Sequence, residues 1–119
     1  MEKRRSVLIV EDEELIALDL ELTLVHHGYD VAIVTHDESE AINFLRDGRP
    51  DAALLDLNLG NGTTSVNVAR KLKAMDCPFM FVTGYSRRTF DLPEDLGDVP
   101  WISKPFKESQ LVKELQRIV

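Results

Sequence analysis

Five side chains in this sequence have the types and positions that phosphoryl chemistry needs. Three are the acids Glu11, Asp12 and Asp56, and the other two are the hydroxyl of Thr83 and the ammonium of Lys104. Three ionised acids held close together repel one another, so such a group either raises the pKa of one acid or requires a cation. A carboxylate nucleophile beside a metal, a cationic clamp and a hydroxyl donor together describe phosphoryl transfer onto an aspartate.

Mg²⁺ is the cation that best suits this group of side chains. It is a hard ion that takes oxygen ligands, keeps several waters and bridges a few carboxylates to a phosphate. The group contains neither histidine nor cysteine, which argues against zinc. We therefore expect Asp12 and Asp56 to share one Mg²⁺ ion, for which Mn²⁺ can substitute.

Each of these residues lies at the end of a short apolar run. Five such runs predict five strands: Val7–Val10, Val31–Val34, Ala52–Leu55, Phe79–Val82 and Val99–Ile102. The third run is uninterrupted and stops at Asp56, as expected for a strand that is buried on both faces of a parallel sheet.

Helical patterns separate the first three strands. The first helix is expected from Glu13 to His27, with Gly28 as its C-terminal cap, and its apolar residues have the spacing of a core-facing stripe: Leu15, Leu18, Leu22 and Val25. The second helix begins at Asp37, with Glu40 three residues later as in a capping box. Its apolar face consists of Ala41, Phe44 and Leu45.

The later helices are less uniform. A third, capped by Thr63 or Thr64, runs through Val66, Val68, Ala69 and Leu72, and the last begins near Lys107 and carries Leu111, Leu115 and Ile118. Between Thr83 and Val99, the sequence is interrupted by Pro93, Gly97 and several aspartates. This interval therefore predicts a short, irregular or mobile fourth helix.

Alternating strands and helices predict a parallel sheet with right-handed crossovers. We expect an α/β, flavodoxin-like (βα)5 doubly wound sandwich with strand order 2-1-3-4-5. In this order strands 1, 3, 4 and 5 are neighbours, and ligands of such sheets bind at the carboxyl ends of the strands. Adjacent strands lie about 4.8 Å apart, which brings Asp12 and Asp56 within reach of one ion. Pro100 agrees with this order, because proline in a strand is tolerated mainly at a sheet edge.

The composition limits the classes of function. With 119 residues, of which 44% are hydrophobic, the chain is expected to form one domain over residues 1–119. A net charge of −7 argues against nucleic acid or an anionic membrane as the main partner. No apolar stretch approaches the roughly 18 residues of a membrane span, and Met1 leads into charge rather than into a signal peptide. With Cys77 as the one cysteine, no internal disulfide can form, and a cytoplasmic protein is expected.

Four motifs at the strand ends resemble those of a two-component response-regulator receiver domain. They are Val10-Glu11-Asp12-Glu13, Leu55-Asp56-Leu57-Asn58-Leu59, Val82-Thr83-Gly84 and Lys104-Pro105-Phe106. Any one of these motifs is weak evidence, but together they are highly specific. The resemblance covers essentially the whole chain.

The resemblance implies a role for each residue. Asp56 would accept the phosphoryl group, and the chain would catalyse its own aspartyl phosphorylation and dephosphorylation rather than a metabolic reaction. Asp12 would ligate Mg²⁺ directly, Glu11 through water and Asn58 through its backbone carbonyl. Contacts to the phosphoryl oxygens would come from Thr83 and Lys104.

The resemblance also implies partners. The phosphoryl donor would be a sensor histidine kinase or a histidine phosphotransferase, and the signal would pass to a downstream protein partner. The receiver would be a monomer or a weak dimer, without nucleic acid or membrane contacts. We expect residues 86–97 to be mobile without phosphate and to become ordered or reposition with it, which changes the surface between the fourth strand and the last helix.

Several residues narrow or depart from the family pattern. Residues 78–85 are similar to a bacterial subgroup with a Phe-Ala-Thr-Gly-x-Tyr-like motif, often stand-alone receivers linked to HWE-type kinases, although Val82 replaces the alanine and the spacing to Tyr85 differs. Gly60 stands where the family usually has proline. Trp101 stands where a switch Tyr or Phe is expected. In the family the position of Tyr85 borders the path of the attacking water, so this side chain is expected to slow loss of the phosphoryl group.

Other interpretations of these residues remain open. Glu11 and Asp12 could simply be acids at a helix N-terminus, where negative charge is favourable, and Lys104 a solvated lysine. His26 and His27 are interpreted as ordinary residues at a helix C-terminus. A haloacid-dehalogenase-type phosphatase would need an acid where Asn58 stands. A flavin module would need a Ser/Thr/Gly-rich phosphate loop after the first strand. The main alternative is a receiver-fold interaction module that does not use phosphorylation, or a phosphate sink.

Overall fold

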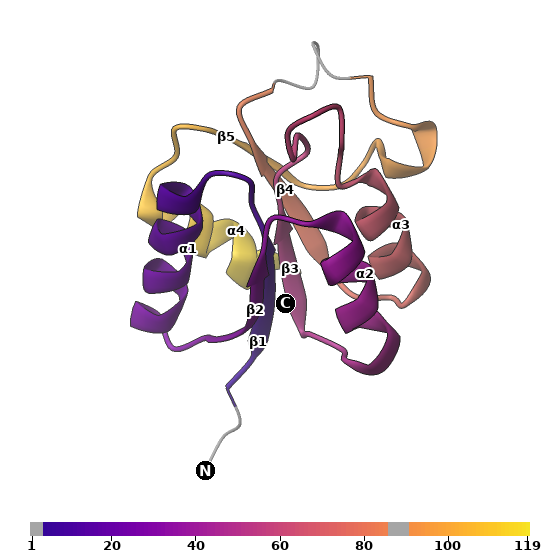
Figure 1. Cartoon of the computed structure of the whole chain (residues 1–119). Coiled ribbons are helices and arrows are strands. Elements are labelled where there is room, and N and C mark those ends of the chain that lie inside the picture. Colours follow the sequence, from indigo (N-terminus) through magenta and orange to yellow (C-terminus); the bar gives the residue numbers. More distant parts are fainter. Residues whose placement is uncertain (1–3, 86–90) are drawn as a thin grey trace.

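The computed structural model describes residues 4–85 and 91–119. Five parallel strands form one sheet in the order β2-β1-β3-β4-β5, which confirms the predicted topology (Figure 1). The strands are β1 (Ser6–Val10), β2 (Asp30–Thr35), β3 (Ala52–Leu55), β4 (Phe79–Thr83) and β5 (Trp101–Ser103). β5 is an edge strand as predicted, but Pro100 lies directly before it and not inside it as the expected strand Val99–Ile102 required.

Helices cover both faces of the sheet. Helices α1 (Glu14–His26) and α4 (Glu108–Ile118) pack on one face, and α2 (Glu38–Asp47) and α3 (Val66–Ala74) pack on the other (Figure 1). Side chains of a strand alternate between its two faces. In β1, Val7 and Ile9 therefore join the core under α1 and α4, whereas Leu8 and Val10 join the core under α2 and α3. The uninterrupted apolar strands thus contribute side chains to two cores, one on each face of the sheet.

The ends of two helices follow their local sequence. Asp37 caps α2, because its Oδ1 accepts a hydrogen bond of 2.9 Å from the backbone N–H of Ser39. The C-cap of α1 is His27 rather than the expected Gly28, which follows it with φ +88°, a conformation that glycine adopts without the steric cost other residues meet. The expected cap of α3 was wrong by one or two residues. The N-cap is Ser65, and the hydroxyl of Thr64 accepts a hydrogen bond of 3.4 Å from Val66 N–H.

The orientation of α1 differs from the prediction. The stripe expected to face the core is exposed: Leu15 is 82% exposed, Leu18 50%, Leu22 59% and Val25 51%. The residues that face the sheet are Ala17, Leu20, Thr23 and Leu24. Because α1 is apolar nearly all round, two faces have helical apolar periodicity, and the smaller side chain of Ala17 fits closer to the sheet. Spacing alone could not choose between the two faces.

The interval between β4 and β5 contains a single 3₁₀ turn, Glu94–Leu96, within its described part. This agrees with the expected short or irregular element. Leu96 is fully buried in the core under α2 and α3, so the turn is anchored by one apolar side chain. The predicted change of residues 86–97 on phosphorylation falls partly on residues 86–90, which lie outside the described residues. Among the residues that the structure describes, no helix is long and apolar enough to cross a membrane.

Candidate functional site

A pocket lies at the carboxyl edge of the sheet, where the loops after β1, β3, β4 and β5 meet. Its lining residues are Asp12, Glu13, Asp56, Asn58, Thr83, Gly84, Tyr85 and Lys104. Every predicted site residue except Glu11 and Trp101 contributes to this lining. Glu13 and Gly84 also line the pocket but were not predicted as site residues. Their adjacency to Asp12 and Thr83 in the sequence was the available signal.

Backbone hydrogen bonds fix the residues that follow each strand. The N–H of Asp56 donates to the carbonyl of Val10 at 2.8 Å, and the N–H of Lys104 donates to the carbonyl of Thr83 at 2.8 Å. The parallel ladder therefore continues one residue beyond the strands. The backbones of Asp56 and Lys104 are therefore fixed to the sheet, although both residues lie in loops.

Lys104 is the central cation of the pocket. Its Nζ lies 3.1 Å from Oδ2 of Asp56, contacts Oε1 of Glu11 and lies 3.8 Å from Glu13. Burial by itself would lower the pKa of Lys104, but the hydrogen bond to Glu11 and the charges of Asp56 and Glu11 outweigh it, so the pKa is raised. Lys104 thus stays protonated and partly neutralises the acids. The Lys104–Pro105 peptide bond is cis.

Glu11 does not line the pocket but contacts Lys104, which does, and Glu11 is 3% exposed. Burial, followed by a hydrogen bond with Asp56, raises its pKa from 4.5 to about 8. Its Oε2 is buried and has no hydrogen-bond partner among the described residues. An unpaired buried oxygen is costly unless a further group, such as an ion or its water, satisfies it.

The oxygen-rich lining fits a hard divalent cation. Asp12 and Asp56 line the pocket, and the neighbouring Glu11 has an unpaired buried oxygen. Gly60 packs beside Asp12, since a Cβ at Gly60 would lie 3.4 Å from both carboxylate oxygens of Asp12. Gly60 also has φ +86°, so any other residue there would have a strained backbone.

Asn58, Thr83 and Tyr85 form one side of the pocket. The amide Nδ2 of Asn58 donates to the hydroxyl of Tyr85 at 3.4 Å, and Oδ1 of Asn58 accepts from Gly60 N–H at 3.0 Å. The backbone N–H of Tyr85 donates to Oγ1 of Thr83 at 3.3 Å. The side chain of Tyr85 is therefore held beside the loop that follows β3.

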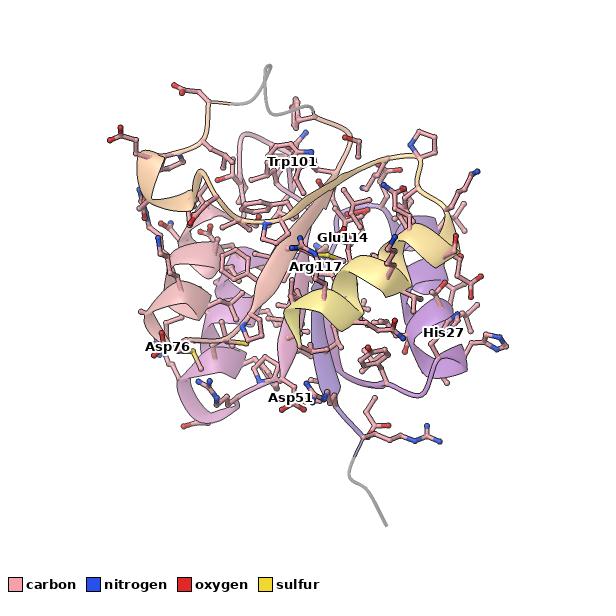
Figure 2. The ribbon with its side chains drawn as sticks, turned by 180° about the vertical axis from the view of Figure 1, so that it is seen from behind. His27, Asp51, Asp76, Trp101, Glu114 and Arg117 are labelled. Atoms are coloured by element: carbon pink, nitrogen blue, oxygen red, sulfur yellow. The ribbon has the colours of Figure 1, made fainter. Side chains whose placement is uncertain are left out.

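Trp101 (Figure 2) belongs to the edge strand β5 and does not line the pocket. Its indole N–H donates to the backbone carbonyl of Tyr85 at 3.0 Å, and its ring lies edge-on to Phe81 with centroids 5.8 Å apart. Trp101 thus links the edge strand β5 to the residue that borders the pocket. Sequence reasoning identified the residue but not this contact.

Comparison with known proteins establishes the family. Residues 7–116 match the response regulator receiver domain. The chain belongs to this family. Among curated relatives, this receiver is 33% identical over 110 residues to the phyllosphere-induced regulator PhyR of Methylorubrum extorquens, covering 89% of the chain and 40% of PhyR. It is 30% identical over 119 residues to the transcriptional regulatory protein PdtaR of Mycobacterium tuberculosis, covering 97% of the chain and 57% of PdtaR. The receiver thus spans about half the length of these relatives.

Solved structures agree with the fold. SdrG from Sphingomonas melonis superposes with a TM-score of 0.84 and 37% identity, covering 99% of this receiver and 98% of SdrG. The receiver domain of PhyR from Erythrobacter litoralis superposes with a TM-score of 0.83 and 30% identity, covering 97% of this receiver and 89% of that chain. The chemotaxis protein CheY4 of Vibrio cholerae superposes with a TM-score of 0.80 and 24% identity, covering 98% of this receiver and 100% of that chain. This comparison supports the fold alone.

Proposed function

We propose that this receiver accepts a phosphoryl group on Asp56 from the phosphohistidine of a sensor histidine kinase or a histidine phosphotransferase, in the bacterial cytoplasm. The observation that carries the proposal is the position of Asp56. Its carboxylate is buried, lines a pocket at the sheet edge and lies 3.1 Å from the ammonium of Lys104. A buried acid paired with a cation at a pocket floor is a nucleophile with a charge clamp beside it.

The two carboxylate oxygens of Asp56 have different surroundings. Oδ2 is paired with Lys104, whereas Oδ1 accepts a long hydrogen bond of 3.4 Å from the N–H of Asn58. We assign the attack on phosphorus to Oδ1. An O–P bond forms, the P–N bond to the donor histidine breaks, and the imidazole leaves with its electron pair. Lys104 and the hydroxyl of Thr83 would contact the transferred phosphoryl oxygens.

Asp12, Asp56 and the backbone carbonyl of Asn58 would hold Mg²⁺, and Glu11 would contribute through water. The bound ion supplies Lewis-acid neutralisation of the phosphoryl oxygens. The unpaired oxygen of Glu11 supports this assignment, because it is buried on a side chain that contacts Lys104 of the pocket.

The exposed stripe on α1 is our proposed docking surface for the donor protein. Leu15 and Leu18 lie at the pocket end of α1, and a groove lined by Asp12, Leu18 and Glu21 joins the stripe to the pocket edge. Glu14 and Asp19 add further negative charge to this helix. An apolar helical surface with a basic rim is therefore the complementary partner.

The output would use the chain between β4 and β5. A phosphoryl group at Asp56 adds up to about two negative charges, which draw Lys104 and Thr83 toward it. Tyr85 follows Thr83 closely, and Trp101 is bonded to the Tyr85 carbonyl, so a shift of Thr83 would reach the edge strand. A downstream partner would read this surface.

One feature favours a second candidate function, a phosphorylation-independent interaction module or a phosphate sink. The family's switch aromatic is replaced by Trp101, whose N–H is already bonded to a backbone carbonyl on the outer side of the pocket. Such a tether would oppose a large aromatic rotation.

The deciding experiment is intact-protein mass spectrometry after incubation with acetyl phosphate and Mg²⁺. We expect one phosphoryl adduct on the wild type and none on Asp56→Asn or after chelation. If no adduct forms and beryllofluoride with Mg²⁺ leaves Trp101 fluorescence unchanged, the phosphorylation-independent interaction module holds. An adduct together with unchanged fluorescence would indicate a phosphate sink.

Donor docking has its own test. Phosphotransfer from the source organism's histidine kinases should slow in Leu18→Ala and Leu22→Ala, while labelling by acetyl phosphate stays at the wild-type rate. Asn43→Ala, an exposed change on α2 at the other face, is the matched control. Equal slowing with both donors would contradict the docking role.

A further inference from the structure

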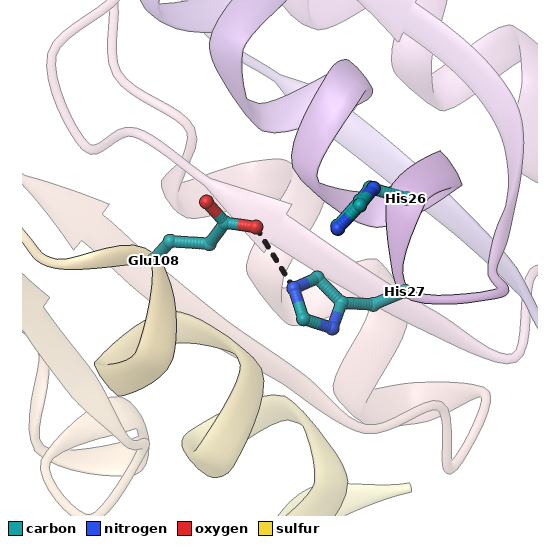
Figure 3. Close-up of side chains that lie close together, drawn as sticks. All are labelled: His26, His27 and Glu108. Atoms are coloured by element: carbon teal, nitrogen blue, oxygen red, sulfur yellow. Dashed lines mark hydrogen bonds and ion pairs between the residues drawn. The ribbon is translucent and has the colours of Figure 1, made fainter.

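His26, His27 and Glu108 converge at the junction of two helices (Figure 3). His26 ends α1, His27 is its C-cap, and Glu108 is the first residue of α4. His27 and Glu108 lie 81 residues apart in the sequence. None of the three lines the Asp56 pocket.

The three side chains point to one place. Each offers one ligand atom, and these atoms all lie within 4.8 Å of one another. Nε2 of His27 lies 2.8 Å from Oε1 of Glu108, and the rings of His26 and His27 are 5.1 Å apart and nearly perpendicular. In the part of the chain that the structure describes, this is the one such group of three His, Cys, Asp or Glu side chains.

We propose that His26, His27 and Glu108 form a binding site for a divalent transition metal of the zinc type. Two imidazoles and one carboxylate are a ligand set that Zn²⁺ takes in proteins, with water in the fourth position. This set differs in kind from the oxygen ligands of the Asp56 pocket. Mg²⁺ prefers the latter and gains little from imidazole.

The geometry needs only small adjustments. Zn²⁺ with bonds of about 2.0–2.2 Å places its ligand atoms roughly 3.4 Å apart in a tetrahedral site. The His27–Glu108 contact would therefore open slightly and His26 would move inward. All three side chains are exposed at the surface, so this movement disturbs no core packing. The site adjoins an open groove lined by Asp19, Leu22, Thr23, Val25, His26 and Glu108.

The three side chains already contact one another without an ion. A hydrogen bond joins His27 to Glu108, and an edge-on ring contact joins His26 to His27. The end of α1 adds a further favourable feature, because the partial negative charge at a helix C-terminus stabilises a nearby cation. A metal bound here would link α1 to α4 and should stabilise the folded state.

The test is Zn²⁺ binding to the full chain by isothermal titration calorimetry, with excess Mg²⁺ present to occupy the Asp56 pocket. We expect one Zn²⁺ per chain and, for His26→Gln, His27→Gln or Glu108→Gln, a loss of affinity of at least about tenfold, since even an outer-shell partner is worth about that much. His36→Gln, which removes the third histidine of the chain, is the matched control and should bind as the wild type does.

A second measurement distinguishes zinc binding at this site from zinc binding in the Asp56 pocket. Side-chain ¹⁵N spectra should show Zn²⁺-dependent shifts of the His26 and His27 ring nitrogens and none for His36, in both wild type and Asp12→Asn. Unchanged affinity in the three variants, or ring signals of His26 and His27 that do not move, would overturn the proposal. Binding that is lost in Asp12→Asn but kept in His27→Gln would place the zinc in the Asp56 pocket instead.

Discussion

The Asp56 pocket and the histidine cluster, formed by His26, His27 and Glu108, are two places where side chains from distant segments meet, and they are built differently. In the pocket, Asp56 and Lys104 are anchored by backbone hydrogen bonds that extend the sheet ladder, and Glu11 and Asp56 are buried. In the cluster, the side chains lie on exposed helix ends and share one hydrogen bond. The charges of a buried site therefore affect the free energy of unfolding directly. The side chains of an exposed site affect it mainly when they bind a ligand.

The largest expected difference between the two sites concerns Asp56→Asn. This change removes the nucleophile, so we expect complete loss of the phosphoryl adduct from acetyl phosphate, measured by intact mass. Zn²⁺ affinity at the histidine cluster should stay the same in this variant. Asp98→Asn, at an exposed aspartate, is the control and should label as the wild type does. An adduct on Asp56→Asn would mean that another residue is the acceptor.

A smaller effect is expected for Lys104→Ala. It leaves the buried Asp56 carboxylate without its cation, and breaking a buried ion pair typically costs about 3–5 kcal/mol of unfolding free energy. Urea unfolding without divalent ions should show this loss, and Mg²⁺ should recover part of it. Lys113→Ala on the exposed side of α4 should lie close to the wild type. Equal stability of the two variants would show that Lys104 is not a structural cation.

The pocket should also make stability depend on pH. The pKa of Glu11 is about 8 in the folded state against 4.5 ordinarily, so between these values the folded protein holds a proton that the unfolded chain releases. Without divalent ions, the free energy of unfolding should therefore fall as pH rises from 5 to 8, by at most about 1.4 kcal/mol per pH unit. Urea unfolding at several pH values measures the slope.

Glu11→Gln removes the titrating group and should flatten that slope. Glu14→Gln, at an exposed acid on α1, should keep it. Identical slopes in wild type and Glu11→Gln would show that burial does not hold the proton on Glu11.

The smallest effect is expected at the histidine cluster without metal. The side chains of His27 and Glu108 are 35% and 53% exposed, and exposed ion pairs contribute little. His27→Gln should change the free energy of unfolding by less than about 0.5 kcal/mol in chelator. With Zn²⁺ added, thermal unfolding of the wild type should shift upward and that of His27→Gln should not. A large loss already in chelator would indicate a structural role for His27 in the α1 end.

Much of the fold could be predicted because its signals are local. The uninterrupted run Ala52–Leu55 matches β3 to the residue, and Asp37 caps α2 as its sequence suggested. Which face of α1 is buried could not be predicted. Ala17 and Leu24 lie on one apolar face and Leu15 and Leu18 on another, and both faces have helical spacing. Only contact with the sheet decides which side is buried.

The site shows the same division. Strand-end positions alone indicated that Asp12, Asp56, Thr83 and Lys104 would share one edge, because parallel strands end together. The pairing of Lys104 with Glu11 and Asp56, and the tether from Trp101 to Tyr85, depend on side-chain directions that no spacing encodes.

The receiver family, the strand order and the residues at the carboxyl edge of the sheet could all be predicted from local sequence, because apolar runs and strand-end motifs are properties of neighbouring residues. Tertiary structure alone decided the exposed face of α1, the burial that raises the pKa of Glu11 and the meeting of His26 and His27 with Glu108. Each of these depends on how segments far apart in the chain pack, and packing sets both distance and solvent exposure.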